Sequence, residues 1–141
     1  MTNITRPLAL AACLGISTLA LAATGPAQQK VLDQYSADAK AGGGAFAGFS
    51  AARGKALFLS RSATGKPDTP SCTTCHTEDP RKAGQTRAGK AIEPMALSVS
   101  PDRYADLAKT EKWFARNCDS VLGRACTPLE KGDFITFMVS Q

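Results

Sequence analysis

The 141-residue chain contains one histidine, one tryptophan and only 6% aromatic residues. So few large aromatic side chains are a weak basis for a self-sufficient core, and a bulky buried cofactor would compensate for them. No stretch alternates polar and apolar residues in the manner of a half-buried strand, and no internal repeat is visible. These absences argue against a sheet or repeat architecture and indicate a small, helical, loop-rich fold.

A strong charge of one sign is also missing. The formal net charge is only +5, and one of these charges, Arg6, lies near the N-terminus. Such mild basicity is not the footprint of a nucleic-acid-binding protein. The length fits a single small domain once any targeting segment has been removed.

The N-terminal segment lacks the ~20 strongly apolar residues that a membrane span needs. Its apolar run, residues 8–22, follows Arg6, is rich in alanine and ends in the sequence A-L-A. A signal peptidase accepts this small-x-small pattern. We therefore predict a signal peptide over residues 1–22, one domain over residues 23–141 and a periplasmic location. Acylation of Cys13 in a lipoprotein is an alternative, because the preceding residues look like a lipobox.

Helices are expected along most of the remaining chain. Gly54 removes a side chain from one helix face and predicts a close helix crossing there. Thr127 and Glu130 have capping-box spacing, with Pro128 at the first helical position. Residues 62–95 are rich in glycine, proline, serine and threonine and predict a long loop. The expected helices cover residues 28–40, 50–61, 101–108 and 110–117, and a C-terminal helix follows Thr127.

The strongest motif is Cys72-Thr73-Thr74-Cys75-His76, which has the C-x-x-C-H pattern of covalent haem attachment. Two thiols of one short turn would bond to the porphyrin, and His76 would bind the iron as proximal ligand. Three alternatives use the same cysteines: a thioredoxin-like pair, a zinc site with Cys118 and Cys126, or two disulfides. With haem on the first pair, Cys118 and Cys126 remain for a disulfide in an exported protein.

The second axial ligand decides the function. Because the chain has one histidine, the candidates are Met95, Met138, Asn117, a lysine or an open position. The soft thioether of Met95 would favour ferrous iron and is typical of an electron carrier. The amide oxygen of Asn117 is a hard, weak ligand that reduction would release. Trp113 shares a helical face with Asn117, four residues away.

The chain resembles one known family from about Gly54 onward, which is nearly all of the chain that would remain after signal-peptide cleavage. The matching segments are residues 65–76, 83–87, 101–103, 111–113, 116–118, 120–121, 123–124 and 126–128. They are similar to the sphaeroides haem protein family of oxygen-binding cytochromes c. The resemblance implies an all-α, class I cytochrome c fold around one covalent haem c.

The same resemblance implies roles for particular residues. Asn117 would be the ferric ligand, Cys118 and Cys126 a nearby disulfide, and Trp113 part of the pocket wall. On reduction Asn117 would leave, and the ferrous iron would bind oxygen or nitric oxide. The expected electron donors are a dihaem cytochrome c and a membrane cytochrome b. Met95 stands where the family has a non-ligating apolar residue, so a Met95-ligated electron-transfer cytochrome remains the alternative function.

A basic cluster follows the haem motif. It would steer an acidic redox partner toward an exposed haem edge, although a solvated loop explains it equally well. The cluster consists of Arg81, Lys82, Arg87 and Lys90.

Overall fold

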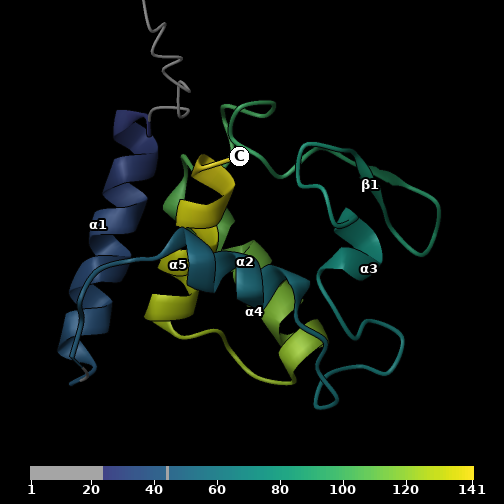
Figure 1. Cartoon of the computed structure of the whole chain (residues 1–141), viewed down its shortest axis with the longest axis horizontal. Coiled ribbons are helices and arrows are strands. Elements are labelled where there is room, and N and C mark those ends of the chain that lie inside the picture. Colours follow the sequence, from purple (N-terminus) through teal and green to yellow (C-terminus); the bar gives the residue numbers. More distant parts are fainter. Residues whose placement is uncertain (1–23, 44) are drawn as a thin grey trace, which may run out of the picture.

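Five helices and one very short hairpin make up the described part of the protein. The computed structural model describes residues 24–43 and 45–141. In chain order the elements are α1 (Pro26–Ala41), α2 (Ala51–Leu59), α3 (Thr73–His76), β1 (Gly84–Gln85), β2 (Ala91–Ile92), α4 (Leu107–Leu122) and α5 (Pro128–Val139). Figure 1 shows α1 on one side, α2, α4 and α5 in the middle, and α3 with β1 on the other side. The expected all-α class is confirmed, whereas the predicted signal peptide lies outside the described residues.

Helices α2 and α5 form the most extensive contact between elements of the described residues. A Cβ atom on Gly54 would lie 2.0 Å from the carbonyl oxygen of Asp133, so only glycine allows this approach. The Asp133 carboxylate is buried and accepts hydrogen bonds from the Ser50 amide at 2.7 Å and from the Arg53 guanidinium at 2.6 Å. Phe58, one turn after Gly54, is fully buried. The predicted crossing at Gly54 is confirmed.

Helix α1 packs on α5 through the apolar stripe that the sequence predicts. Val31, Leu32 and Tyr35 are buried on this face. Lys131 of α5 lies over the Tyr35 ring, 5.4 Å from its centroid, and its ammonium group is 2.7 Å from the carboxylate of Glu111 in α4. One lysine therefore connects α1, α4 and α5.

Helix α4 differs from the sequence prediction. The helix expected over residues 101–108 is wrong, because residues 101–104 form turns and Tyr104 has a φ of 59°. The helix begins instead at Leu107, where the Asp106 carboxylate accepts a hydrogen bond from the Lys109 amide at 2.7 Å. It then continues without a break to Leu122. The turn is held by distant partners of Arg103 and Tyr104, described below, which local propensity does not reveal.

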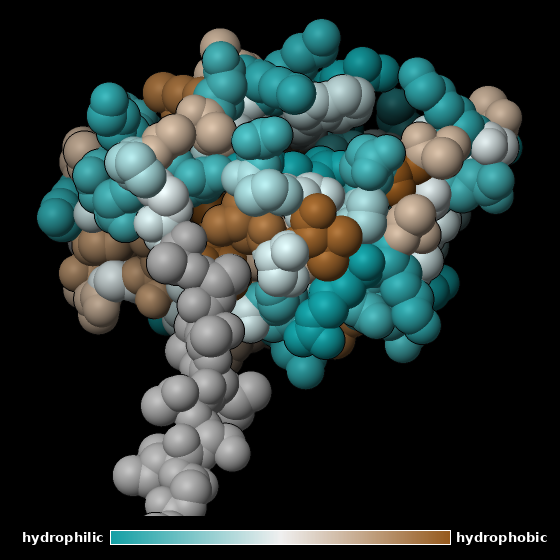
Figure 2. Space-filling view, turned by 90° about the horizontal axis from the view of Figure 1, so that it is seen from above, coloured by the Kyte–Doolittle hydropathy of each residue, from teal (hydrophilic) through white to brown (hydrophobic). Residues whose placement is uncertain are grey.

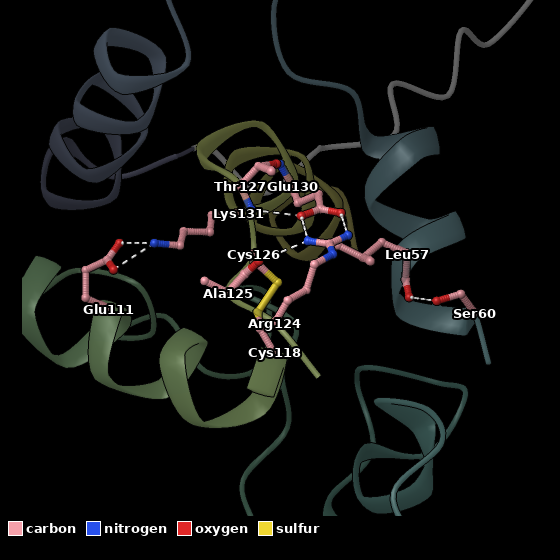
Figure 3. Close-up of a disulfide and its surroundings, with 10 residues drawn as sticks. All are labelled: Leu57, Ser60, Glu111, Cys118, Arg124, Ala125, Cys126, Thr127, Glu130 and Lys131. Carbon is pink, nitrogen blue, oxygen red and sulfur yellow. Dashed lines mark hydrogen bonds and ion pairs between the residues drawn. A yellow bond between two sulfur atoms is a disulfide. The ribbon is translucent and has the colours of Figure 1, made fainter. Parts of the chain in front are cut away.

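The connection from α4 to α5 is short and cross-linked. Gly123 ends α4 in the left-handed conformation, with a φ of 66°. The capping box of α5 is present as predicted, since the side chains of Thr127 and Glu130 each accept from the other's backbone amide. Cys118 and Cys126 are joined in a disulfide between the end of α4 and the residue before the α5 cap (Figure 3).

The segment expected to lack regular structure, residues 62–95, contains α3 and two-residue strands. The strands pair antiparallel, with Gly84 opposite Ile92 and Gln85 opposite Ala91. Figure 2 shows one face of the molecule as mostly hydrophilic, with hydrophobic side chains in a few places. Within residues 24–43 and 45–141, none of the helices has the length and apolar character needed to span a bilayer.

Candidate haem-binding site

The cysteine motif folds into a single tight helical turn. The Ser71 side chain, which is 2% exposed, accepts a hydrogen bond from the Thr73 amide at 3.2 Å, and the His76 amide donates to the Cys72 carbonyl at 3.1 Å. Cys72 and Cys75 are half-buried, and neither forms a disulfide. The turn thus presents two thiols and one imidazole within five residues, as covalent haem attachment requires.

Burial sets the ionisation of this turn. Desolvation raises the pKa of the Cys72 thiol to about 11. Desolvation, together with the nearby charge of Arg103, lowers the pKa of His76 to about 4, so its imidazole is neutral at neutral pH. The Nδ1 atom of His76 is buried and has no hydrogen-bond partner. A neutral imidazole is the form that binds a metal, and a buried ring nitrogen without a partner costs free energy. The residues of this turn therefore fit a c-type haem.

The other uses of the four cysteines fit less well. The zinc alternative needs the thiolates of Cys118 and Cys126, which the disulfide consumes. Across the described residues, no three side chains of histidine, cysteine, aspartate or glutamate gather as metal ligands. A thioredoxin-like pair needs a preceding strand, whereas Cys72 follows a loop.

Close packing holds the hairpin against the attachment turn. Strand β1 is the main element in contact with α3. A Cβ atom on Gly84 would lie 2.1 Å from the Cys75 carbonyl oxygen and 3.0 Å from the His76 Cα. Any side chain at this position would push the hairpin away from the turn that carries His76.

Met95 lies in the core, and its backbone is fixed on both sides. The amides of Met95 and Ala96 donate to the Pro80 carbonyl at 2.8 and 2.9 Å, and the Tyr104 hydroxyl donates to the Met95 carbonyl at 3.0 Å. The Met95 side chain is 7% exposed and belongs to a cluster that includes Phe114. These contacts give the thioether apolar neighbours and restrict its segment.

Arg103 contributes to the site, although its residue type and neighbours in the sequence do not predict this role. Its guanidinium donates to the carbonyls of Pro94 at 2.5 Å and Glu93 at 2.6 Å. Its charge is also close enough to His76 to lower that pKa. The family-like segment 101–103 marks its position, but nothing local shows that it holds the chain around Met95.

Asn117 and Trp113 are both exposed, one turn apart on α4. Trp113 is 48% exposed, and the Arg116 guanidinium lies over its ring, 5.4 Å from the centroid. Asn117 is exposed, whereas the next residue, Cys118, is buried and cross-linked. The predicted pair therefore shares one helix face, separate from the core cluster that contains Met95.

One residue of the basic cluster after the haem motif forms an ion pair. Arg87 forms an ion pair with Asp68. Arg81, Lys82 and Lys90 are exposed to solvent.

Several known proteins are similar to this chain in sequence. A family model described as a domain of unknown function, DUF1924, matches residues 44–138, which is more than half of the chain. Cytochrome c-type protein SHP of Cereibacter sphaeroides is 59% identical over 91 residues, covering 64% of this chain and 70% of that protein. Cytochrome c'' of Methylophilus methylotrophus is 34% identical over 89 residues, covering 62% of each protein.

Solved structures of the same two relatives have a similar fold. The structure of oxidised SHP, an oxygen-binding cytochrome c, superposes with a TM-score of 0.74 at 51% identity and covers 81% of this chain and 96% of that chain. A solution structure of cytochrome c'' of M. methylotrophus, concerned with the structural basis of haem-ligand detachment, has a TM-score of 0.69 at 29% identity and covers 81% and 93%. The expected class I cytochrome c fold is confirmed. The chain therefore belongs to the DUF1924 family, the family of SHP, and its cofactor is one covalently bound haem c.

Proposed function

We propose that this protein is a monohaem cytochrome in which Asn117 binds ferric iron and leaves on reduction, so that oxygen or nitric oxide can bind. Cys72 and Cys75 hold the haem, and His76 is the proximal ligand. When bound, the haem supplies a one-electron iron couple with affinity for diatomic gases. The observation that carries the proposal is the different surroundings of the two candidate ligands: the Met95 side chain is packed among apolar core residues, whereas the Asn117 side chain is exposed beside the buried, cross-linked Cys118.

The chemistry of Asn117 supports release on reduction. An amide oxygen is a hard neutral donor, and ferrous iron is a softer ion than ferric iron, so the bond weakens when the iron gains an electron. The adjacent Cys118 is buried and tied to Cys126, which limits the movement of the helix around Asn117. Trp113, one turn away, would form the wall of the gas pocket. Oxygen binding in SHP and haem-ligand detachment in cytochrome c'' are consistent with this behaviour.

Haem attachment is tested by replacing both thiols. We expect Cys72→Ala with Cys75→Ala to leave no covalently bound haem on a denaturing gel stained for peroxidase activity. Haem that remained bound after both replacements would contradict the attachment.

The distal ligand is tested by two replacements in the holoprotein. Asn117→Val should change the ferric absorption and electron paramagnetic resonance spectra, because valine offers no donor atom. Met95→Leu conserves volume, so it should leave the ferric spectrum nearly unchanged at a stability cost below about 1.5 kcal/mol. The ferrous wild-type protein should bind carbon monoxide and nitric oxide. If Met95→Leu instead removes a sulfur-to-iron absorption band and Asn117→Val has no effect, the protein is a Met95-ligated electron carrier.

We further propose a periplasmic location and electron donation by a dihaem cytochrome c and a membrane cytochrome b. The exposed side chains of Arg81, Lys82 and Lys90 would attract an acidic donor. The rate of reduction by such a donor should then fall as ionic strength rises, and replacement of these three residues by glutamine should weaken that dependence. A rate independent of salt would contradict the docking role. N-terminal sequencing of the exported protein tests the cleavage expected after Ala22.

A further inference from the structure

The segment before the haem motif forms a closed surface loop. The amide of Ser62 donates to the Pro70 carbonyl at 2.7 Å and closes the neck of the loop. The amide of Thr69 donates to the Lys66 carbonyl at 2.9 Å and forms a turn inside it. A nine-residue loop whose ends meet in this way is an Ω loop. The loop comprises residues 62–70 and ends two residues before Cys72.

This Ω loop is bonded to the last turn of α4. The amide of Lys66 donates to the Ser120 carbonyl at 2.7 Å, and the Thr64 hydroxyl donates to the Leu122 carbonyl at 2.7 Å. The Thr69 hydroxyl lies 3.1 Å from the Ser120 carbonyl oxygen and 2.7 Å from the Ser120 hydroxyl. Both hydroxyls are satisfied when Thr69 donates to the carbonyl and Ser120 donates to Thr69. The loop thereby supplies donors for carbonyls that a helix end leaves without intrahelical partners.

Two glycines make this contact backbone-to-backbone. A Cβ atom on Gly65 would lie 2.3 Å from the Val121 carbonyl oxygen, and one on Gly123 would lie 2.2 Å from the Thr64 carbonyl oxygen. Contacts of this kind cannot relax by side-chain rotation. The loop and the end of α4 therefore move together.

The contact lies between the two halves of the proposed haem site. Ser120 follows Asn117 by three residues, which is about 4.5 Å along the helix axis. Thr69 precedes Cys72 by three residues, and the intervening Ser71 is buried and accepts a hydrogen bond from the Thr73 amide of the attachment turn. Among the bonds between the Ω loop and α4, the Thr69–Ser120 pair is the one nearest in sequence to both Cys72 and Asn117, with three residues on either side.

We propose that Thr69 and Ser120 are positioning residues that set the place of Asn117 relative to the attachment turn, and so set how fully Asn117 occupies the ferric iron. This inference rests on the proposed function of Asn117. Loss of the Thr69 hydroxyl removes one hydrogen-bonded link, for which typical energies correspond to a change of roughly threefold to tenfold in an equilibrium.

The test compares three variants of the haem-loaded protein. We expect Thr69→Val to change the ratio of Asn-ligated to unligated ferric protein by roughly threefold to tenfold, read from the electron paramagnetic resonance spectrum. Thr69→Ser, which keeps the hydroxyl, should restore the wild-type ratio. Thr136→Val is the matched control, because Thr136 is also half-buried and donates a side-chain hydrogen bond, to the Gly132 carbonyl at 2.8 Å within α5. It should leave the ferric spectrum unchanged.

The outcomes separate the two proposals. An unchanged ferric spectrum in Thr69→Val, with a changed spectrum in Asn117→Val, would overturn the positioning role alone. An equal spectral change in Thr136→Val would also overturn it, since a general loss of stability would then explain the effect. No spectral effect of Asn117→Val would overturn both proposals. If Thr69→Val does not fold, Ser120→Ala must show the same direction of change for the inference to stand.

Discussion

The α2–α5 crossing can be tested by adding a single methyl group. In Gly54→Ala, the new Cβ atom would lie 2.0 Å from the Asp133 carbonyl oxygen and 2.9 Å from the Phe137 Cβ atom. Real Cβ atoms essentially never approach closer than 3.0 Å, so the helices must separate by at least about 1 Å. The obstacle on α5 is backbone, which cannot rotate out of the way. Separation of the helices is therefore the main way to relieve the clash.

The expected cost follows from this gap. A radial gap of about 1 Å forfeits up to half of the dispersion energy of the contacts it opens, and overpacking a core typically costs about 1–3 kcal/mol. Phe58 is fully buried at the same crossing, so its contacts with the rings of Phe134 and Phe137 would loosen too. Alanine regains about 1 kcal/mol of helix propensity over glycine. We expect a net loss of about 1–2 kcal/mol in the free energy of unfolding, because the loosened Phe58 contacts add to the overpacking cost.

The assay is guanidinium denaturation of the oxidised haem protein, followed by far-ultraviolet circular dichroism. Gly132→Ala in α5 is the matched comparison, because it gains the same helix propensity but meets the ring of Phe49, with its nearest atom at 2.1 Å. A side chain can rotate away, so this variant should lose less stability than Gly54→Ala. Equal stability of Gly54→Ala and the wild type, or a larger loss in Gly132→Ala, would refute the packing explanation.

Two further predictions concern the α4–α5 connection. Hydrogen bonds to Arg124 are the main cause that lowers the pKa of Glu130 in the folded protein. The ionised Glu130 side chain therefore contributes stability above the ordinary glutamate pKa of about 4.3. This stability is lost as the pH falls through the lower pKa of the folded state. Glu130→Gln should therefore lower the free energy of unfolding at neutral pH by less than about 1 kcal/mol, since Arg124 is half-exposed. The difference between the variant and the wild type should vanish in acid. A constant difference at all pH values would contradict this prediction. Mass spectrometry of the non-reduced protein should find Cys118 linked to Cys126. Replacing both cysteines by serine should lower the free energy of unfolding by about 2.5 kcal/mol, because the disulfide closes a short loop. Two free thiols in the wild type would contradict the disulfide.

Features that depend on neighbouring residues could be predicted from the sequence. The capping box needs only Thr127 and Glu130 and their own backbone amides, so its spacing is sufficient evidence. The attachment turn is similarly local, because two thiols and His76 lie within five residues. The close crossing at Gly54 could also be predicted, since a glycine inside an apolar helix face is costly without a packing reason.

The start of α4 could not be predicted, because Ser100-Pro101 has the local signature of a helix start. The turn that replaces this helix start depends on two side chains. Arg103 donates hydrogen bonds to backbone carbonyls nine and ten residues earlier in the chain, and the Tyr104 hydroxyl donates to the carbonyl of Met95. Local propensity is a weak prior that such tertiary bonds override.

The amino-acid sequence by itself determined the all-α class, the covalent haem motif and the set of possible distal ligands, because these depend on residue type and short spacing. The tertiary structure decided where those ligands lie. Met95 packs in the core with apolar neighbours from other elements, while Asn117 is exposed on α4. The contact of Thr69 with Ser120 joins residues 51 positions apart. Contacts at such a separation form only when the whole chain has closed around its core, so no local pattern encodes them.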